Sequence, residues 1–468
     1  MMRDAQRTPD RDGSRHTRLV VLPLFFLSGA AGLVYEVTWT RAFGTVFGNT
    51  VFATSAVLTA FMLGLALGSR LLGSIADVTS RPLQTYAFLE LGVGAYAFAF
   101  PHILRLTDHL YAWLFRTLAP GPDLLNLVRF ILSIAILLVP TVLMGGTLPI
   151  LSRLWSVSAT SSPDRADSRG PRSNTSHPGQ GIGLLYALNT LGAVVGSFAA
   201  GFLLIRTVGV KSTVYLAAAT NILVALAAFI LSRFIGPDPN IKPHTPPRRR
   251  PITKAATRPA VVPAPARDNV RRIVLVTVAV AGFCSLACEV LWTRVLVFVL
   301  GTSTYAFACM LTCFILGLAI GAFIASRLLI RRTAKPILSL AILQLLVALA
   351  VLVSIRLSAL IGRFDYALIS RFHIAGFDKL TAGGFWPQVA VHFIDAALVL
   401  LIPAVIMGCI FPIAVQTCTR SLNAIGRRVG QVYAWNIIGC VLGSFVAGFV
   451  MVPLLGSCSS SPSSSRSA

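Results

Sequence analysis

The residues best suited to chemistry in this chain are two glutamates, Glu36 and Glu289, each inside a long apolar segment. A carboxylate in hydrocarbon costs at least about 2.5–3.5 kcal/mol, so such residues usually face a partner or a cavity. Two carboxylates that face one cavity can be neutralised by a diamine or by protons, and we predict that they bind a cationic solute. The alternative is structural, with each glutamate paired to an arginine such as Arg41, Arg70 or Arg294.

Two further residue pairs complete the predicted substrate site. Trp39 and Trp292 each follow a glutamate by three residues, and an aromatic ring beside a carboxylate can bind a cation through its face. A tryptophan followed by an arginine at a helix end is also an ordinary interfacial anchor, and this alternative stays open. Asn189 and Asn436 are expected to hydrogen-bond between helices and are included in the same site.

These residues come in pairs because the chain contains an internal repeat. The segment SGAAGLVYEVTWTR at 28–41 returns as AGFCSLACEVLWTR at 281–294. Two further blocks repeat in the same order, namely Pro140 to Pro149 with Pro403 to Pro412, and a Tyr-x-x-Asn-x-x-Gly-x3-Gly-Ser-Phe motif from Tyr186 and from Tyr433. We interpret the chain as a duplicated membrane domain.

Composition places both repeats in a membrane. Of the 468 residues, 55% are hydrophobic and only 12% are charged, about half the charged fraction of a soluble domain. Apolar segments of about 20 residues recur, each long enough to cross about 30 Å of hydrocarbon as a helix. The predicted fold is all-α, a major-facilitator-like membrane helix bundle in two parallel repeats. We expect eleven spans, near 19–38, 50–72, 84–104, 126–151, 183–206, 212–233, 273–293, 303–325, 336–358, 388–414 and 429–453.

Membrane topology explains the net charge of +24 without nucleic acid. Most Lys and Arg fall on the side of the N-terminus, which the positive-inside rule makes cytoplasmic, and basic segments beside a membrane attract anionic lipid. We expect a multi-pass protein of a bacterial inner membrane, in contact with the lipid bilayer and with no nucleic-acid partner. The expected division is a basic cytoplasmic arm (1–18), a first repeat of six spans (19–233), a basic Pro-rich cytoplasmic linker (234–272), a second repeat of five spans (273–453) and a Ser-rich tail (454–468).

The two repeats differ at their ends. The first continues past Gly209 into a sixth span, whereas the second, after the matching Gly456, gives the sequence SCSSSPSSSRSA. We expect a truncated or frame-shifted copy that lacks a twelfth span, with a natural eleven-span design as the alternative.

Other polar or irregular motifs rank below the glutamate pair. In the segments that begin at Met144 and Met407, Gly and Pro together predict either a broken helix at a substrate site or a simple kink. Glu90, and Asp395 with His392, are intramembrane ionisable residues without repeat mates.

The cysteines indicate packing and not chemistry. Cys284 and Cys288, and Cys309 and Cys313, are spaced to share a helix face, but the first half has small or apolar residues at most of the matching places. No nucleophile–base set or metal-ligand set repeats either. We therefore expect no catalytic residue, no metal and no cofactor.

The assembled blocks resemble a known family. SGAAGLVYEVTWTR, FMLGLALGSR, MGGTLPIL and YALNTLGAVVGSFAAGFLL, with their second-half copies, are similar to the membrane region of bacterial fused spermidine synthase-like proteins, over about residues 19–456. A Gly73-x3-Asp77-x3-Arg81 motif resembles a loop motif of the major facilitator superfamily. The family resemblance implies a major-facilitator-like membrane domain ahead of a cytoplasmic aminopropyltransferase domain, and a role in polyamine biosynthesis coupled to polyamine movement.

The sequence has no recognisable aminopropyltransferase domain. Such a domain needs a Gly-rich nucleotide loop after a strand, whereas Gly145-Gly146 and Gly383-Gly384 precede no acid and lie in no strand–helix unit. We predict the membrane domain of a spermidine synthase-like protein that binds or moves polyamine-like cations, with a separate synthase domain as an expected partner; whether the chain is an enzyme stays open. The alternatives are a stand-alone secondary transporter of another small solute and a truncated, non-functional fragment.

Overall fold

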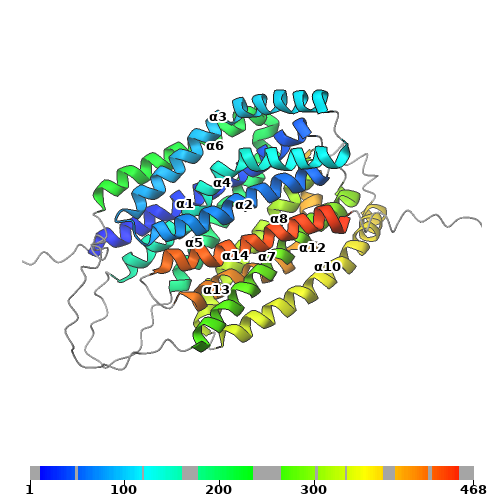
Figure 1. The fold of residues 1–468 in the computed structure, drawn as a ribbon. Coiled ribbons are helices and arrows are strands. Elements are labelled where there is room, and N and C mark those ends of the chain that lie inside the picture. The colour runs from blue at the N-terminus through cyan, green and yellow to red at the C-terminus, as the bar shows by residue number, and fades with distance from the viewer. Residues whose placement is uncertain are drawn as a thin grey trace, which may run out of the picture.

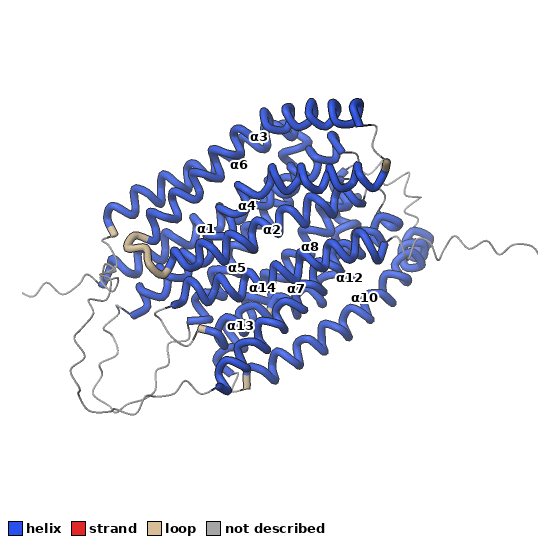
Figure 2. Tube along the Cα trace, viewed as in Figure 1, coloured by secondary structure: helices blue, strands red, loops and turns tan. Residues whose placement is uncertain are grey.

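The computed structural model describes residues 11–47, 51–118, 121–160, 178–235, 265–300, 304–332, 335–372, 385–419 and 424–452. Within these ranges the chain is helical apart from short turns, and no strand occurs (Figure 2). The first half (Figure 1) contains α1 (Arg11–Phe47), α2 (Val51–Ala76), α3 (Pro82–Leu118), α4 (Pro122–Thr160), α5 (Pro178–Phe198), the π-helical turn η1 (Ala199–Leu204) and α6 (Ile205–Phe234). The second half contains α7 (Pro265–Leu300), α8 (Thr304–Ile324), η2 (Ala325–Leu329), α9 (Ile330–Arg332), α10 (Pro336–Phe372), α12 (Phe385–Gly408), α13 (Ile410–Cys418), α14 (Ile425–Val446) and η4 (Ala447–Met451).

Ten helical stretches of the described chain are long and apolar enough to cross a membrane. The longest, Gly179–Phe234, has 56 residues, and at 1.5 Å per residue it would measure about 84 Å, far more than one crossing needs. Gly209 divides it, because its φ of 79° and ψ of 169° are not helical. The stretch therefore supplies two of the eleven expected spans, and the predicted polytopic all-α bundle is confirmed.

Several helices extend beyond the apolar segments that predicted them. α3 runs to Leu118, well past the expected end at 104, and α7 begins at Pro265, inside the segment 234–272 expected as a linker. Hydropathy marks only the part of a helix that crosses hydrocarbon, so polar helical ends such as these are not visible to it. Residues 236–264 and the Ser-rich tail lie outside the described chain.

Glycines bring matching helix pairs together in both halves. A Cβ at any of four glycines would meet the main chain of the neighbouring helix, which is why only glycine permits so close an approach. The contacts correspond under the repeat, with Gly192 and Gly196 of α5 on Phe26 and Ala30 of α1, and Gly439 and Gly443 of α14 on Ala279 and Phe283 of α7.

The two halves meet along two seams, α2 against α14 and α5 against α8. On the side of the bundle where α1 begins, Gly73 lies against Gly430 in the first seam, and Gly183 lies against Ser326 in the second. These two contacts are equivalent under the repeat, so each seam closes on this side in the same way.

Buried hydroxyl pairs close the same two seams on the opposite side. Thr59 and Ser444 hydrogen-bond at 2.7 Å, and Ser197 and Thr312 at 3.0 Å. Thr59 matches Thr312 in the repeat and Ser197 matches Ser444, so the pairs are also equivalent. Each seam is thus tied above and below its centre.

One seam carries an additional polar link at Asp77. Its Oδ1 accepts a hydrogen bond from the Gly426 N–H at 2.8 Å, and its Oδ2 accepts one from the Arg427 N–H at 2.9 Å. These N–H groups belong to the first turn of α14, where they lack intrahelical partners and form the positive end of the helix dipole. The acid of the Gly73-x3-Asp77-x3-Arg81 motif therefore binds the second half of the molecule to the first.

The outside of the bundle is apolar. Large hydrophobic side chains stand exposed along its outer helices, among them Leu106 on α3, Leu223 on α6 and Leu345 on α10. A soluble protein rarely exposes so many large apolar side chains together, whereas a lipid bilayer covers them.

Candidate functional site

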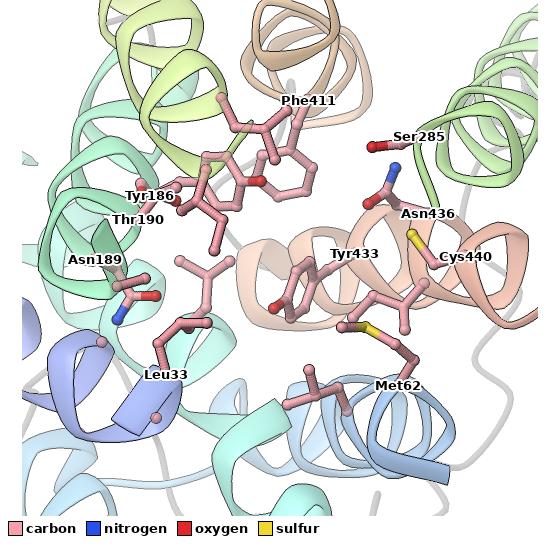
Figure 3. Close-up of a pocket in the computed structure, with 18 of the residues that line it drawn as sticks. Leu33, Met62, Tyr186, Asn189, Thr190, Ser285, Phe411, Tyr433, Asn436 and Cys440 are labelled. Carbon is pink, nitrogen blue, oxygen red and sulfur yellow. Dashed lines mark hydrogen bonds between the residues drawn. The ribbon is translucent and has the colours of Figure 1, made fainter. Parts of the chain in front are cut away.

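A cavity of about 230 Å³ lies between the two halves, midway between the closed ends of the seams. It is walled by α1, α2, α4 and α5 from the first half and by α7, α8, α12, α13 and α14 from the second. Figure 3 shows that its labelled lining residues converge from both halves. The charged and polar groups of its wall are Ser28, Glu36, Thr147, Tyr186, Asn189, Thr190, Ser285, Glu289, Tyr433 and Asn436.

Glu36 and Glu289 face this one cavity from α1 and α7. Both are buried, with 7% and 6% of their surfaces exposed. Within the described ranges, neither carboxylate has a hydrogen bond or an ion pair. Arg41 and Arg70 are exposed and do not reach them, and the side chain of Arg294 lies outside what the structure describes. The cavity thus holds two acidic groups without a described basic partner, which is a costly arrangement for ionised carboxylates.

The two asparagines line the cavity and also fix its walls. The Asn189 side-chain amide donates to the carbonyl oxygen of Phe25 in α1 at 3.0 Å, and the Asn436 amide donates to that of Val278 in α7 at 3.3 Å. The expected interhelical hydrogen bonds are confirmed, and they are equivalent under the repeat. Each bond holds α5 or α14 against the helix that carries a glutamate.

Trp39 and Trp292 lie behind the cavity and are not among the residues that line it. The Trp39 indole is fully buried and stacks on Tyr35 and Phe100, with ring centroids 4.9 Å away in both cases. These ring contacts hold the indole in the protein core, although Trp39 follows Glu36 by only three residues. A buried indole cannot serve as an interfacial anchor, and a contact with a bound cation remains a prediction.

Tyr186 and Tyr433 are cavity residues that sequence reasoning did not assign to the site. They are equivalent in the repeat, and the ring of Phe411 lies between them, 4.5 Å from Tyr186 and 5.8 Å from Tyr433 between centroids (Figure 3). The signal was present, because each tyrosine precedes a site asparagine by three residues and therefore shares most of its helix face.

The Gly- and Pro-containing segments contribute to the cavity in two different forms. α4 stays helical through Pro149, whereas the matching helix of the second half stops at Gly408 and resumes at Ile410 as α13. The interruption is one residue long, and the Cys409 N–H bonds to the Ile406 carbonyl at 3.2 Å. Met144 and Met407 both line the cavity. Because the Cys409 backbone keeps helical angles, with φ of −70° and ψ of −22°, the second-half segment forms a local kink and not a broken helix.

The lower-ranked ionisable residues are not among those that line the cavity. Glu90, His392 and Asp395 are all buried, at 1%, 5% and 5% exposure. Glu90 belongs to α3, and the other two belong to α12. No cluster of three or more metal-ligating side chains occurs in the described ranges.

No family model matches the chain. Two curated relatives from Streptomyces coelicolor are similar to parts of it. Polyamine aminopropyltransferase 1 is 24% identical over 204 residues, which cover 43% of this chain and 32% of that protein. Polyamine aminopropyltransferase 2 is 28% identical over 220 residues, which cover 46% of this chain and 34% of that protein. The chain thus matches about a third of the length of these relatives.

Solved structures resemble the chain over nearly its whole length. A bacterial homologue of the iron transporter ferroportin, in its outward-facing state, has a TM-score of 0.50 and 11% identity, covering 93% of this chain and 98% of that one. The human organic anion transporter MFSD10 has a TM-score of 0.47 and 14% identity, covering 92% of both chains. At these identities only the fold is shared. The chain is a multi-pass membrane protein with a transporter-type helix bundle.

Proposed function

We propose that this chain is the membrane domain of a spermidine synthase-like protein, and that it binds a polyamine-like cation in the cavity between its halves and moves it across the bilayer. One observation carries the proposal. Glu36 and Glu289 face the same cavity from equivalent helices, with no described basic group beside them. A solute with two positive ends would neutralise both carboxylates at once, and the pair would then tolerate burial.

The rest of the cavity wall suits a slender, flexible cation. The wall also contains apolar residues such as Leu33, Phe314 and Ile315, which can pack against a methylene chain. Tyr186 and Tyr433 add aromatic faces of the kind that bind ammonium groups. A volume of about 230 Å³ is small next to the sites of drug-sized ligands, which favours a narrow solute.

Movement across the membrane follows from the two seams. A transporter of two repeats opens its central site to one side by rocking one repeat against the other. Here the contacts at Gly73 and Gly183 would part to open one side, and the Thr59–Ser444 and Ser197–Thr312 pairs would part to open the other. By the positive-inside rule the first of these sides is the cytoplasm of a bacterial cell, with the membrane being the inner one.

The names of the curated relatives support the choice of a polyamine, because both relatives are polyamine aminopropyltransferases. The transferase chemistry itself belongs to a separate synthase domain, which we propose as the partner on the cytoplasmic side.

A second candidate is a stand-alone secondary transporter of another small solute. The whole-length likeness to a bacterial transporter of the ferroportin type favours it, and it needs no synthase partner. The two candidates differ in what the cavity accepts, and a binding measurement separates them.

The test is binding of radiolabelled spermidine to the purified chain in lipid nanodiscs. Glu36→Gln and Glu289→Gln each remove one charge-assisted contact worth about 1.5–3 kcal/mol, so we expect each to weaken binding about 10- to 150-fold. Asp108→Asn is the matched control, since Asp108 is an exposed acid on α3 outside the cavity. Wild-type affinity in both glutamine variants would make the carboxylates structural, and no binding by the wild type would favour another solute.

A further inference from the structure

A buried carboxyl group next to the cavity is not used by the proposed function. Glu90 of α3 is 1% exposed and is held by groups from two other helices. Its Oε1 accepts a hydrogen bond from the Ser28 hydroxyl of α1 at 2.6 Å, and its Oε2 accepts one from the Asn221 amide of α6. The Tyr35 hydroxyl of α1 in turn donates to the Asn221 Oδ1 at 2.9 Å. These four residues form one connected polar network inside the first half.

No described cation balances a charge on Glu90. The titratable side chains that face it are Tyr35 of α1 and Tyr86 of α3 itself. The other acid on this part of α1, Glu36, faces the cavity. α4 has no acidic or basic residue from 130 to 152, and α6 has none from 214 to 232.

An ionised carboxylate in this position would cost several kcal/mol without a partner charge. The neutral acid avoids that cost and keeps its hydrogen bonds. The surroundings of Glu90 therefore favour a bound proton.

Ser28 connects this group to the cavity. Its residue lines the cavity wall, while its hydroxyl is bonded to Glu90. A serine hydroxyl can donate one hydrogen bond and accept two, so it can donate to the carboxylate or accept from the acid. In a transfer, Ser28 passes its proton to the Glu90 Oε1 and regains one from a hydronium ion in the cavity. The balance is one hydronium ion consumed, one water released and one carboxylic acid formed.

The matching positions of the second half do not carry the same residues. The position that matches Ser28 is Ala281, and the position that matches Tyr35 is Cys288. An alanine has no hydroxyl to relay a proton. The Ser28–Glu90 pair therefore has no counterpart at the matching positions, Ala281 and Leu343.

We propose that Glu90 is a proton-binding site that exchanges its proton with the cavity through the Ser28 hydroxyl. Glu90 binds the proton behind the cavity and touches no ligand. Ser28 positions the Glu90 carboxyl and relays the proton between it and the cavity. A cavity that carries a cation and also exchanges a proton can couple cation movement to proton movement. Only this coupling rests on the proposed function; the proton site itself does not.

Infrared spectroscopy of the ligand-free chain in nanodiscs tests the proton site directly. A titration from about pH 4 to about pH 9 covers the pKa range from free to deeply buried carboxyl groups. We expect a carboxylic-acid C=O band that persists at neutral pH, is lost in Glu90→Gln and is kept in Asp108→Asn. If Glu90→Gln does not fold, Glu90→Asp serves instead, and the band should shift. If neither Glu90→Gln nor Glu90→Asp changes the band at neutral pH, the proposal is overturned.

Exchange into D₂O tests the route. In Ser28→Ala the deuterium shift of the Glu90 band should slow by about ten-fold or more, as for loss of a positioned proton-transfer group. Ser285→Ala is the matched control, a cavity serine of α7 with no hydrogen bond to a carboxylate in the described chain. Wild-type exchange in Ser28→Ala would overturn the relay.

These measurements use no ligand, so they separate two failures. Absence of spermidine binding would remove the proposed function and leave the proton site standing. Absence of the Glu90 band would do the reverse.

Discussion

The cavity offers a cation two kinds of residue, a carboxylate that carries charge and a tyrosine ring that presents an aromatic face. The glutamates sit on α1 and α7, and the tyrosines sit on α5 and α14. Each kind comes once from either half. A bound dication would therefore meet the same pair of groups at both of its ends.

Replacement of the tyrosines separates the aromatic face from the hydroxyl. Tyr186→Phe and Tyr433→Phe keep the ring, whereas Tyr186→Leu and Tyr433→Leu remove it. A cation over a desolvated ring gains about 0.5–2 kcal/mol, so the leucine variants should bind spermidine about 2- to 30-fold more weakly while the phenylalanine variants stay near wild type. Equal losses in both series, measured with the radioligand, would point to the hydroxyl and contradict an aromatic contact.

How far the sequence predicts the site depends on the kind of residue. Glu36 and Asn189 were found because polar groups in apolar helices are conspicuous and each has a repeat mate. Tyr186 was missed as a site residue, because an aromatic residue in an apolar helix looks the same whether it packs in the core or faces a cavity. Trp39 was assigned to the cavity by its spacing alone, and that spacing does not show that the ring stacks on Tyr35 and Phe100 in the core.

Helix pairs depend on glycines that leave no room for a side chain. A Cβ at Gly192 of α5 would meet the main chain of α1 at Phe26. Gly192→Ala should therefore force the helices apart and destabilise the fold by about 1–3 kcal/mol, measured as the denaturant midpoint in detergent. Gly32→Ala on α1 is the matched control, because its added Cβ meets nothing within 4 Å. Similar midpoints for both variants would show that the α1–α5 contact can relax.

Helices could be predicted from the sequence where the thickness of the bilayer hydrocarbon sets their length. The break at Gly209 falls between the expected spans 183–206 and 212–233, and its positive φ is the conformation that glycine adopts without strain. The one-residue interruption between α12 and α13 was less predictable. The same Gly–Pro chemistry in α4 leaves the helix continuous, because surrounding contacts decide whether such a segment breaks.

Asp77 and the glycine contacts together hold the two halves of the molecule against each other on the side of the bundle where α1 begins. A carboxylate on two free N–H groups at a helix start is worth about 0.5–2 kcal/mol. Asp77→Asn should therefore raise hydrogen–deuterium exchange in the first turn of α14, around Gly426 and Arg427, by about 2- to 30-fold. Asp108→Asn should leave it unchanged. Unaltered protection in Asp77→Asn would mean that packing alone closes this seam.

The Asp77 link makes the two seams unequal. Position 330, which matches Asp77 in the repeat, is Ile330, so the α5–α8 seam has no carboxylate at a helix start. At its start α5 makes a neutral bond to α13 instead, from the Gly179 N–H to the Gln416 Oε1 at 2.7 Å. The more strongly bonded seam should stay closed and act as the hinge when the other seam opens. If the chain transports a cation as we propose, its halves should part first between α5 and α8 and pivot on α2 and α14, and the cation would then leave from one flank of an otherwise two-fold molecule.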